Sequence, residues 1–162
     1  MLNARRIFLL TLLPFALACA SARDSSRPSL AGTWRLVSFE DWDAAGRVTR
    51  AFGEHPAGYL VYDDTGRFFF NLMKVPPPSA EGFAGGSPNQ EQKVRAFDAY
   101  ASYFGRYSVD WDRRIVTHQV EGSLNPALNG TDQRRPFELS GDTLILTDRK
   151  SWRRVFVRAP PA

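Results

Sequence analysis

Short apolar and aromatic segments, separated by turn-forming residues, recur through most of this chain and constrain its fold more than any other feature. About eight segments have the composition of β-strands, at residues 33–40, 58–62, 67–73, 106–109, 114–121, 134–139, 143–147 and 152–158. The links between neighbours are short and rich in turn residues, so the strands are expected to pair antiparallel. About eight such strands in one small domain predict a closed barrel or a sandwich.

One part of the chain departs from this pattern. Residues 75–78 read Val-Pro-Pro-Pro, which is unsuited to a central strand because proline lacks the N–H that the sheet needs. A helix is predicted after it, with Ser87 as the N-cap, Pro88 at the first helical position and Gln90 completing a capping box. Apolar residues then recur at helical spacing: Val94, Phe97, Ala101 and Phe104. Gly105 is placed to end this helix, whose apolar stripe is expected to lie against the barrel or across its mouth.

The composition fits one domain with a packed core. The chain has 162 residues and carries 12 Phe, 5 Tyr and 4 Trp, which is enough aromatic surface for such a core. It has a single cysteine, so the fold must be stable without an internal disulfide. Its arginines are scattered singly or in pairs and form no basic stripe, which argues against a nucleic-acid partner.

The N-terminus has the layout of an export signal. Residues 1–6 carry two arginines, residues 7–17 are almost entirely apolar, and small residues surround Cys19. Residues 15–19 resemble a bacterial lipobox, in which the cysteine becomes the lipid-modified first residue. The alternative is ordinary signal-peptidase cleavage, which would discard or free the thiol. The paired arginines also resemble a twin-arginine export signal, so both export routes stay open.

We therefore expect three segments: a lipoprotein-type signal peptide at residues 1–18, a polar tether at 19–29 and a β-barrel domain at 30–159. The protein is predicted to be exported and held by its N-terminal lipid on the periplasmic side of the cell envelope, as an outer-membrane lipoprotein. A soluble periplasmic or secreted protein is the alternative. Removing residues 1–18 takes two of the 21 basic residues and no acidic ones, leaving 19 basic against 17 acidic residues, or a net charge of +2.

A set of short motifs, taken together, resembles one family. The motifs include residues 32–34 (Gly-Thr-Trp), 58–62, 105–107, 123–126 and 130–135. They are similar to the lipocalin-like domain family, a group of small single-domain proteins of bacteria and fungi, over nearly all of the chain from Leu30 onward. The resemblance implies a mainly β, calycin-type antiparallel barrel of about eight strands with one α-helix packed on it. It also implies that Gly32 and Trp34 close one barrel end, with an arginine of the last strand, here Arg154, lying across the tryptophan.

Several polar residues are not needed by a barrel alone and form the candidate ligand-binding site. They lie on strand faces shared with apolar residues or in the neighbouring loop: His118, Arg135, Gln133, Tyr107, Ser123 and Asn125. His118 alternates with Val116 and Val120, and Arg135 shares a face with Phe137. If both faces point inward, an imidazole and a guanidinium meet inside an aromatic cavity. Such a site holds an apolar ligand by its body and a carboxylate by its head.

Two other interpretations of these residues stay open. His118 and Arg135 could brace the long loop at residues 121–132 through hydrogen bonds to its carbonyls. Alternatively, His118 together with a tyrosine could move a proton in a reaction. Motifs for a serine nucleophile, a phosphate-binding loop or a zinc site are missing, so we predict no catalytic residue, no metal and no cofactor.

Two functions follow from these patterns. The first is a lipid-anchored protein that binds a small hydrophobic molecule, with or without an acidic head, inside the barrel. The second is an isomerase or cyclase that acts on a small hydrophobic substrate there. The missing catalytic motifs favour the first over an enzyme.

Overall fold

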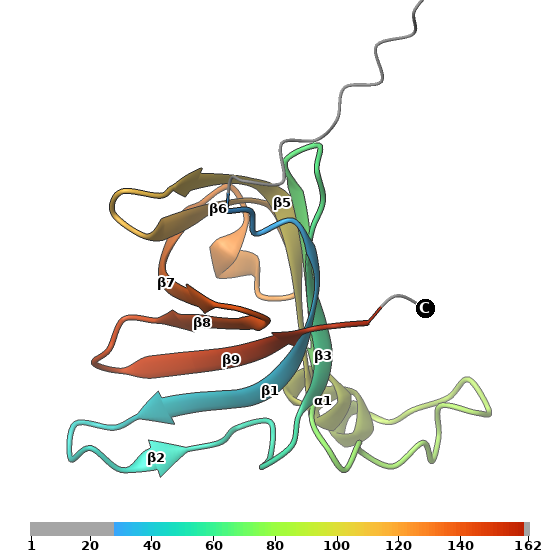
Figure 1. Cartoon of the computed structure of the whole chain (residues 1–162). Coiled ribbons are helices and arrows are strands. Elements are labelled where there is room, and N and C mark those ends of the chain that lie inside the picture. The colour runs from blue at the N-terminus through green and yellow to red at the C-terminus, as the bar shows by residue number, and fades with distance from the viewer. Residues whose placement is uncertain (1–27, 161–162) are drawn as a thin grey trace, which may run out of the picture.

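The sheet closes on itself to form a barrel. The computed structural model describes residues 28–160. Its elements are β1 (Gly32–Trp42), β2 (Val48–Thr49), β3 (Ala57–Tyr62), β4 (Arg67–Met73), α1 (Gln90–Asp98), β5 (Tyr100–Asp110), β6 (Ile115–Ser123), the 3₁₀ helix η1 (Pro126–Leu128), β7 (Asp132–Ser140), β8 (Thr143–Thr147) and β9 (Trp152–Arg158). Apart from the two-residue β2, the strands pair antiparallel in chain order, and β1 also pairs with β9 (Figure 1). The predicted closed barrel of eight antiparallel strands is confirmed.

Alternation of side chains along each strand separates the core from the surface. On β4, Phe68, Phe70 and Leu72 are buried while the residues between them are exposed. Tight turns keep neighbouring strands adjacent: between β3 and β4, Asp63 accepts hydrogen bonds from the backbone N–H groups of Thr65 and Arg67 at 2.9 and 2.7 Å. This period-two pattern is why the strand positions could be expected from the sequence.

The helix is shorter than predicted and starts two residues later. Asn89, not Ser87, is the N-cap, and it forms the capping box with Gln92. The helix ends at Asp98, so the second half of the predicted stripe lies in β5 instead. No residue of α1 is buried, so the prediction that its apolar stripe packs into the core of the barrel was wrong.

Gly105 does not end a helix but lies within β5, where its register with β6 shifts. A Cβ at this position would stand 2.0 Å from the carbonyl oxygen of Gln119 on β6. The glycine therefore permits a close approach of two strands. β5 pairs with β4 over residues 100–106 and with β6 over residues 103–110, and this pairing outweighs the local helical spacing of residues 94–104.

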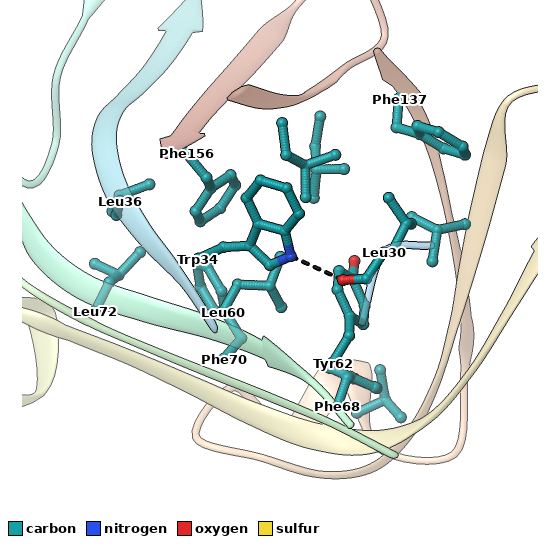
Figure 2. Close-up of a cluster of buried hydrophobic side chains, with 14 residues drawn as sticks. Leu30, Trp34, Leu36, Leu60, Tyr62, Phe68, Phe70, Leu72, Phe137 and Phe156 are labelled. Atoms are coloured by element: carbon teal, nitrogen blue, oxygen red, sulfur yellow. Dashed lines mark hydrogen bonds between the residues drawn. The ribbon is translucent and has the colours of Figure 1, made fainter. Parts of the chain in front are cut away.

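One end of the barrel is closed around Trp34. Its side chain is fully buried, and its indole Nε1 donates a hydrogen bond to the Leu30 carbonyl at 2.8 Å (Figure 2). The guanidinium across this ring belongs to Arg158, at 4.2 Å from the ring centroid, and not to Arg154 as expected. Gly32 is required beside it, because φ is +135° there and a Cβ would stand 2.6 Å from the Arg158 guanidinium.

The predicted signal peptide, the lipobox cysteine Cys19 and most of the tether lie outside the described residues. Within residues 28–160, no helix is long and apolar enough to cross a membrane.

Candidate functional site

A cavity of about 280 Å³ opens at the end of the barrel away from Trp34. Strand register places it there, because its wall includes Phe39, which pairs with Arg154, whereas Trp34 pairs with Arg158. Aromatic side chains form a large part of its wall, among them Phe39, Phe52, Phe70, Tyr103, Trp152 and Phe156. This size is close to the lower bound of small-molecule sites, roughly 300 Å³.

The mouth of the cavity is apolar. Phe97 at the end of α1, Tyr100 at the start of β5 and Leu124 after β6 all line the cavity, yet they are 51%, 41% and 36% exposed. An apolar molecule entering from solvent would cover these side chains. The helix thus contributes to the entrance of the cavity and not to the core.

Two arginines face the cavity, and they differ in their partners. Arg154 donates to Asp41 Oδ1 at 2.7 Å and to the Glu40 carbonyl, and its guanidinium carbon lies 3.3 Å from the Phe39 ring centroid. Burial lowers the pKa of Arg154, and the Asp41 carboxylate counteracts this shift. The positive charge of Arg154 is therefore balanced within the protein.

Arg135 has no such balance. Its Nη2 donates to Gln133 Oε1 at 3.3 Å, and its guanidinium carbon lies 5.1 Å from the Trp152 ring centroid. Within residues 28–160 it forms no ion pair with a carboxylate. A half-buried guanidinium in an aromatic wall is costly without an anion, so the cavity is electrostatically suited to a negatively charged group.

His118 is fully buried but does not line the cavity. Its Nε2 lies 2.6 Å from the Tyr62 hydroxyl and its Nδ1 lies 3.2 Å from the Tyr103 hydroxyl, and its ring stacks on Phe68. Burial lowers the pKa of His118 to about 3, and the positive charge of Arg135 acts in the same direction. The imidazole is therefore neutral at physiological pH. It does not contact the cavity itself, but it contacts the hydroxyl of Tyr103, which lines the cavity.

The other predicted site residues are divided between the cavity and its surroundings. Ser123 and Asn125 line the cavity, but both also support the backbone: Ser123 Oγ donates to the Ser102 carbonyl at 3.3 Å, and Asn125 caps η1 by accepting from Ala127 N at 3.1 Å. Gln133 does not line the cavity, and its Oε1 accepts the hydrogen bond from Arg135. Tyr107 is remote from the cavity, since its hydroxyl donates to the Asp63 carbonyl at 2.8 Å in the β3–β4 turn.

The loop-brace interpretation applies to Arg135 only indirectly. Gln133 links Arg135 to Thr131, whose hydroxyl donates to the Leu128 carbonyl at 2.7 Å. Neither Arg135 nor His118 bonds a carbonyl of residues 121–132 directly within the part of the chain that the structure describes. Gln133 and Thr131 therefore link this loop to β7, and Gln133 also orients the guanidinium of Arg135.

Sequence reasoning missed much of the cavity wall. Trp152, Arg154 and Phe156 alternate along β9, and this pattern could have indicated that Arg154 faces the same interior as the aromatic residues. Tyr103 was assigned to the predicted helix, so its place on β5 in the cavity wall was not expected. Phe39 could not be placed, because a register shift between Leu36 and Ser38 changes which residues of β1 point inward.

Among the described residues, no group of three His, Cys, Asp or Glu side chains is arranged to hold a metal ion.

Comparison with known proteins agrees with this architecture. No curated protein matches the chain. The family model described as a lipocalin-like domain matches residues 31–155. That match covers most of the chain and the whole barrel except the end of β9, so this protein belongs to the lipocalin-like domain family.

Proposed function

We propose that this protein binds a small hydrophobic molecule with an acidic head in the cavity of the barrel. A lipocalin-like barrel fits a small-molecule-binding role. The proposal adds the chemical class of the ligand. The acidic head is proposed because the guanidinium of Arg135 lines the cavity and has no carboxylate partner among the described residues. An anionic ligand would supply that partner.

The aromatic wall supports an apolar body for this ligand. Phe39, Phe52 and Trp152 offer ring faces and edges around a space of about 280 Å³. Burying apolar surface stabilises a complex by about 25 cal/mol per Å² before the costs of association. The wall would therefore provide affinity, and Arg135 would select for the charge of the head.

The position of His118 argues for binding over the isomerase or cyclase alternative. A general base must lie within hydrogen-bond reach of the proton that it removes, directly or through one water. Tyr103 separates His118 from the cavity, and both imidazole nitrogens are engaged by tyrosine hydroxyls. With its pKa lowered to about 3 by burial, His118 is also a poor base.

We propose further that the protein acts outside the cytoplasm, exported by the N-terminal signal and held at the outer membrane by a lipid on Cys19. The order of basic, apolar and small residues before Cys19 supports this assignment. A barrel at the membrane surface would then bind its ligand in the periplasm.

Calorimetric titration tests the ligand assignment. Decanoate and 1-decanol share an alkyl chain and differ in the charge of the head. We expect the wild type to bind decanoate more tightly, and Arg135→Met to weaken decanoate binding by about 10- to 100-fold while changing 1-decanol little. Arg134→Met is the matched control, since Arg134 is exposed on the outer face of the same strand. Equal losses in both arginine variants, or no binding by the wild type, would refute the proposal.

Native mass spectrometry of the purified protein would identify any ligand that co-purifies.

A further inference from the structure

Three side chains connect the closed core to the cavity in a hydrogen-bonded row. The hydroxyl of Tyr62 lies 2.6 Å from His118 Nε2, and the hydroxyl of Tyr103 lies 3.2 Å from His118 Nδ1. Tyr62 and His118 are 1% and 0% exposed, whereas Tyr103 lines the cavity. The row therefore ends at the site that the proposed function assigns to the ligand.

The direction of these hydrogen bonds follows from Tyr62. A neutral imidazole has one N–H donor and one bare nitrogen that accepts. His118 Nε2 is the only hydrogen-bond partner of the Tyr62 hydroxyl among the described residues. A buried O–H without an acceptor is costly, so Tyr62 must donate to Nε2. The proton of His118 then lies on Nδ1 and is donated to the Tyr103 oxygen.

Tyr103 is thereby left with its own O–H as a donor. Its oxygen accepts from His118, and no described residue accepts a hydrogen bond from its hydroxyl. Burial raises the pKa of Tyr103, and Arg135 is close enough to offset part of that rise. The phenol stays protonated at neutral pH, so Tyr103 and Arg135 are two neighbouring donors on one cavity wall.

We infer that Tyr103 and Arg135 together bind a carboxylate at the inner end of the cavity, with the hydrogen of Tyr103 directed there by the Tyr62–His118 pair. This inference rests on the proposed function and specifies the head of the ligand. A carboxylate has two acceptor oxygens for the two donors and a single negative charge for Arg135, since Asp41 already balances Arg154. An ammonium head, which can only donate, finds no free acceptor at these two residues and is repelled by the charge of Arg135. The apolar body would then extend toward Phe97 and the mouth.

The orientation of the row can be measured without a ligand. Nitrogen NMR of ¹⁵N-histidine-labelled protein at neutral pH distinguishes the two neutral tautomers of a buried imidazole. We expect the proton of His118 on Nδ1 and a bare Nε2. A proton on Nε2 would reverse both hydrogen bonds, make Tyr103 the donor to His118 and overturn the inference.

The carboxylate is tested by calorimetry on Tyr103→Phe, which removes one oxygen and keeps the ring. We expect decanoate to bind about 10-fold more weakly than to the wild type, and 1-decanol to lose less, because hydrogen bonds to charged acceptors are the stronger ones. An unchanged affinity of Tyr103→Phe for decanoate would overturn the role of Tyr103. If Arg135→Met still weakened decanoate binding in that case, the proposed function would stand.

A wild type that bound neither compound would overturn both proposals. The thermal unfolding midpoint of each variant controls for misfolding. If Tyr103→Phe failed to fold, the tautomer of wild-type His118 would decide the inference instead.

Discussion

His118 illustrates how burial assigns a role to an ionisable side chain. Its strand position alone left it open as a ligand-binding group, a brace or a base. In the structure it lies between two tyrosines and against Phe68, and its pKa is lowered to about 3 by burial and by Arg135. A residue that stays neutral and donates one hydrogen bond while accepting another fixes the geometry of its neighbours.

This burial predicts a pH dependence of stability. Between its usual pKa of 6.5 and about 3, the histidine binds a proton in the unfolded chain but not in the folded protein. The unfolded state therefore binds more protons in that range, and stability falls as the pH falls, whereas above 6.5 the residue contributes no slope. His118→Gln can still donate and accept hydrogen bonds but cannot titrate.

We therefore expect the thermal midpoint of the wild type to fall more steeply than that of His118→Gln as the pH is lowered through this range. The variant keeps His55, the other histidine, so the difference between the profiles isolates His118. Parallel profiles, measured by circular dichroism, would show that His118 protonates in the folded protein as easily as in the unfolded chain.

At the scale of elements, β5 and α1 show where local sequence pattern is not enough. Val94, Phe97, Ala101 and Phe104 fit helical spacing, yet Ala101 and Phe104 belong to a strand. Residues 101, 103 and 105 also fit the period of a strand, and pairing with two neighbours decides between the two patterns. The capping chemistry was recognised but placed two residues early, because Ser87 and Asn89 are both suitable caps.

Because α1 is shorter than predicted and is not buried, the expected effect of truncating Phe97 on stability is smaller. As part of a buried stripe, its truncation would cost roughly 3–5 kcal/mol. Because Phe97 is 51% exposed at the cavity mouth, we now expect Phe97→Ala to change the free energy of unfolding by only about 0.5 kcal/mol. Its affinity for decanoate should fall by roughly 3- to 10-fold, as part of the ligand's apolar contact is lost.

Phe68→Ala provides the comparison, because Phe68 is fully buried in the core and absent from the cavity wall. This variant should lose roughly 3–5 kcal/mol of unfolding free energy. Denaturant unfolding of both variants checks the contrast. A loss of several kcal/mol in Phe97→Ala would mean that the helix is a core element after all.

At the scale of the whole molecule, alternation and turn residues were enough to predict about eight antiparallel strands in a barrel or a sandwich, and the resemblance of the motifs to one family favoured the barrel. Alternation also grouped His118 with Val116 and Val120 on one face of β6, which is the buried face in the structure. These patterns were not enough to predict the cavity. Its aromatic wall depends on a bulge that turns Phe39 inward, and its charge depends on which arginine of β9 covers Trp34. Both depend on register between distant strands, and one sequence carries little information about register.

The N-terminal sequence predicts that the protein lies at the cell envelope. Expressed in a Gram-negative host, the protein should partition into detergent and begin at a lipidated Cys19, as the lipobox-like residues 15–19 predict. Cys19→Ser should remain unprocessed or appear in the soluble fraction. Mass spectrometry of the purified protein decides the matter, and a mature N-terminus at Arg23 would rule out the lipid anchor.

The most direct test of ligand binding inside the barrel is a crystal structure of the protein with decanoate. Binding inside the barrel predicts a carboxylate within hydrogen-bond distance of Arg135 and the Tyr103 hydroxyl, with the alkyl chain between Trp152 and the mouth at Phe97. A decanoate molecule found only on the outer surface, or one whose carboxylate points out of the mouth while Arg135 stays unpaired, would contradict binding of an acidic head by Arg135 and Tyr103.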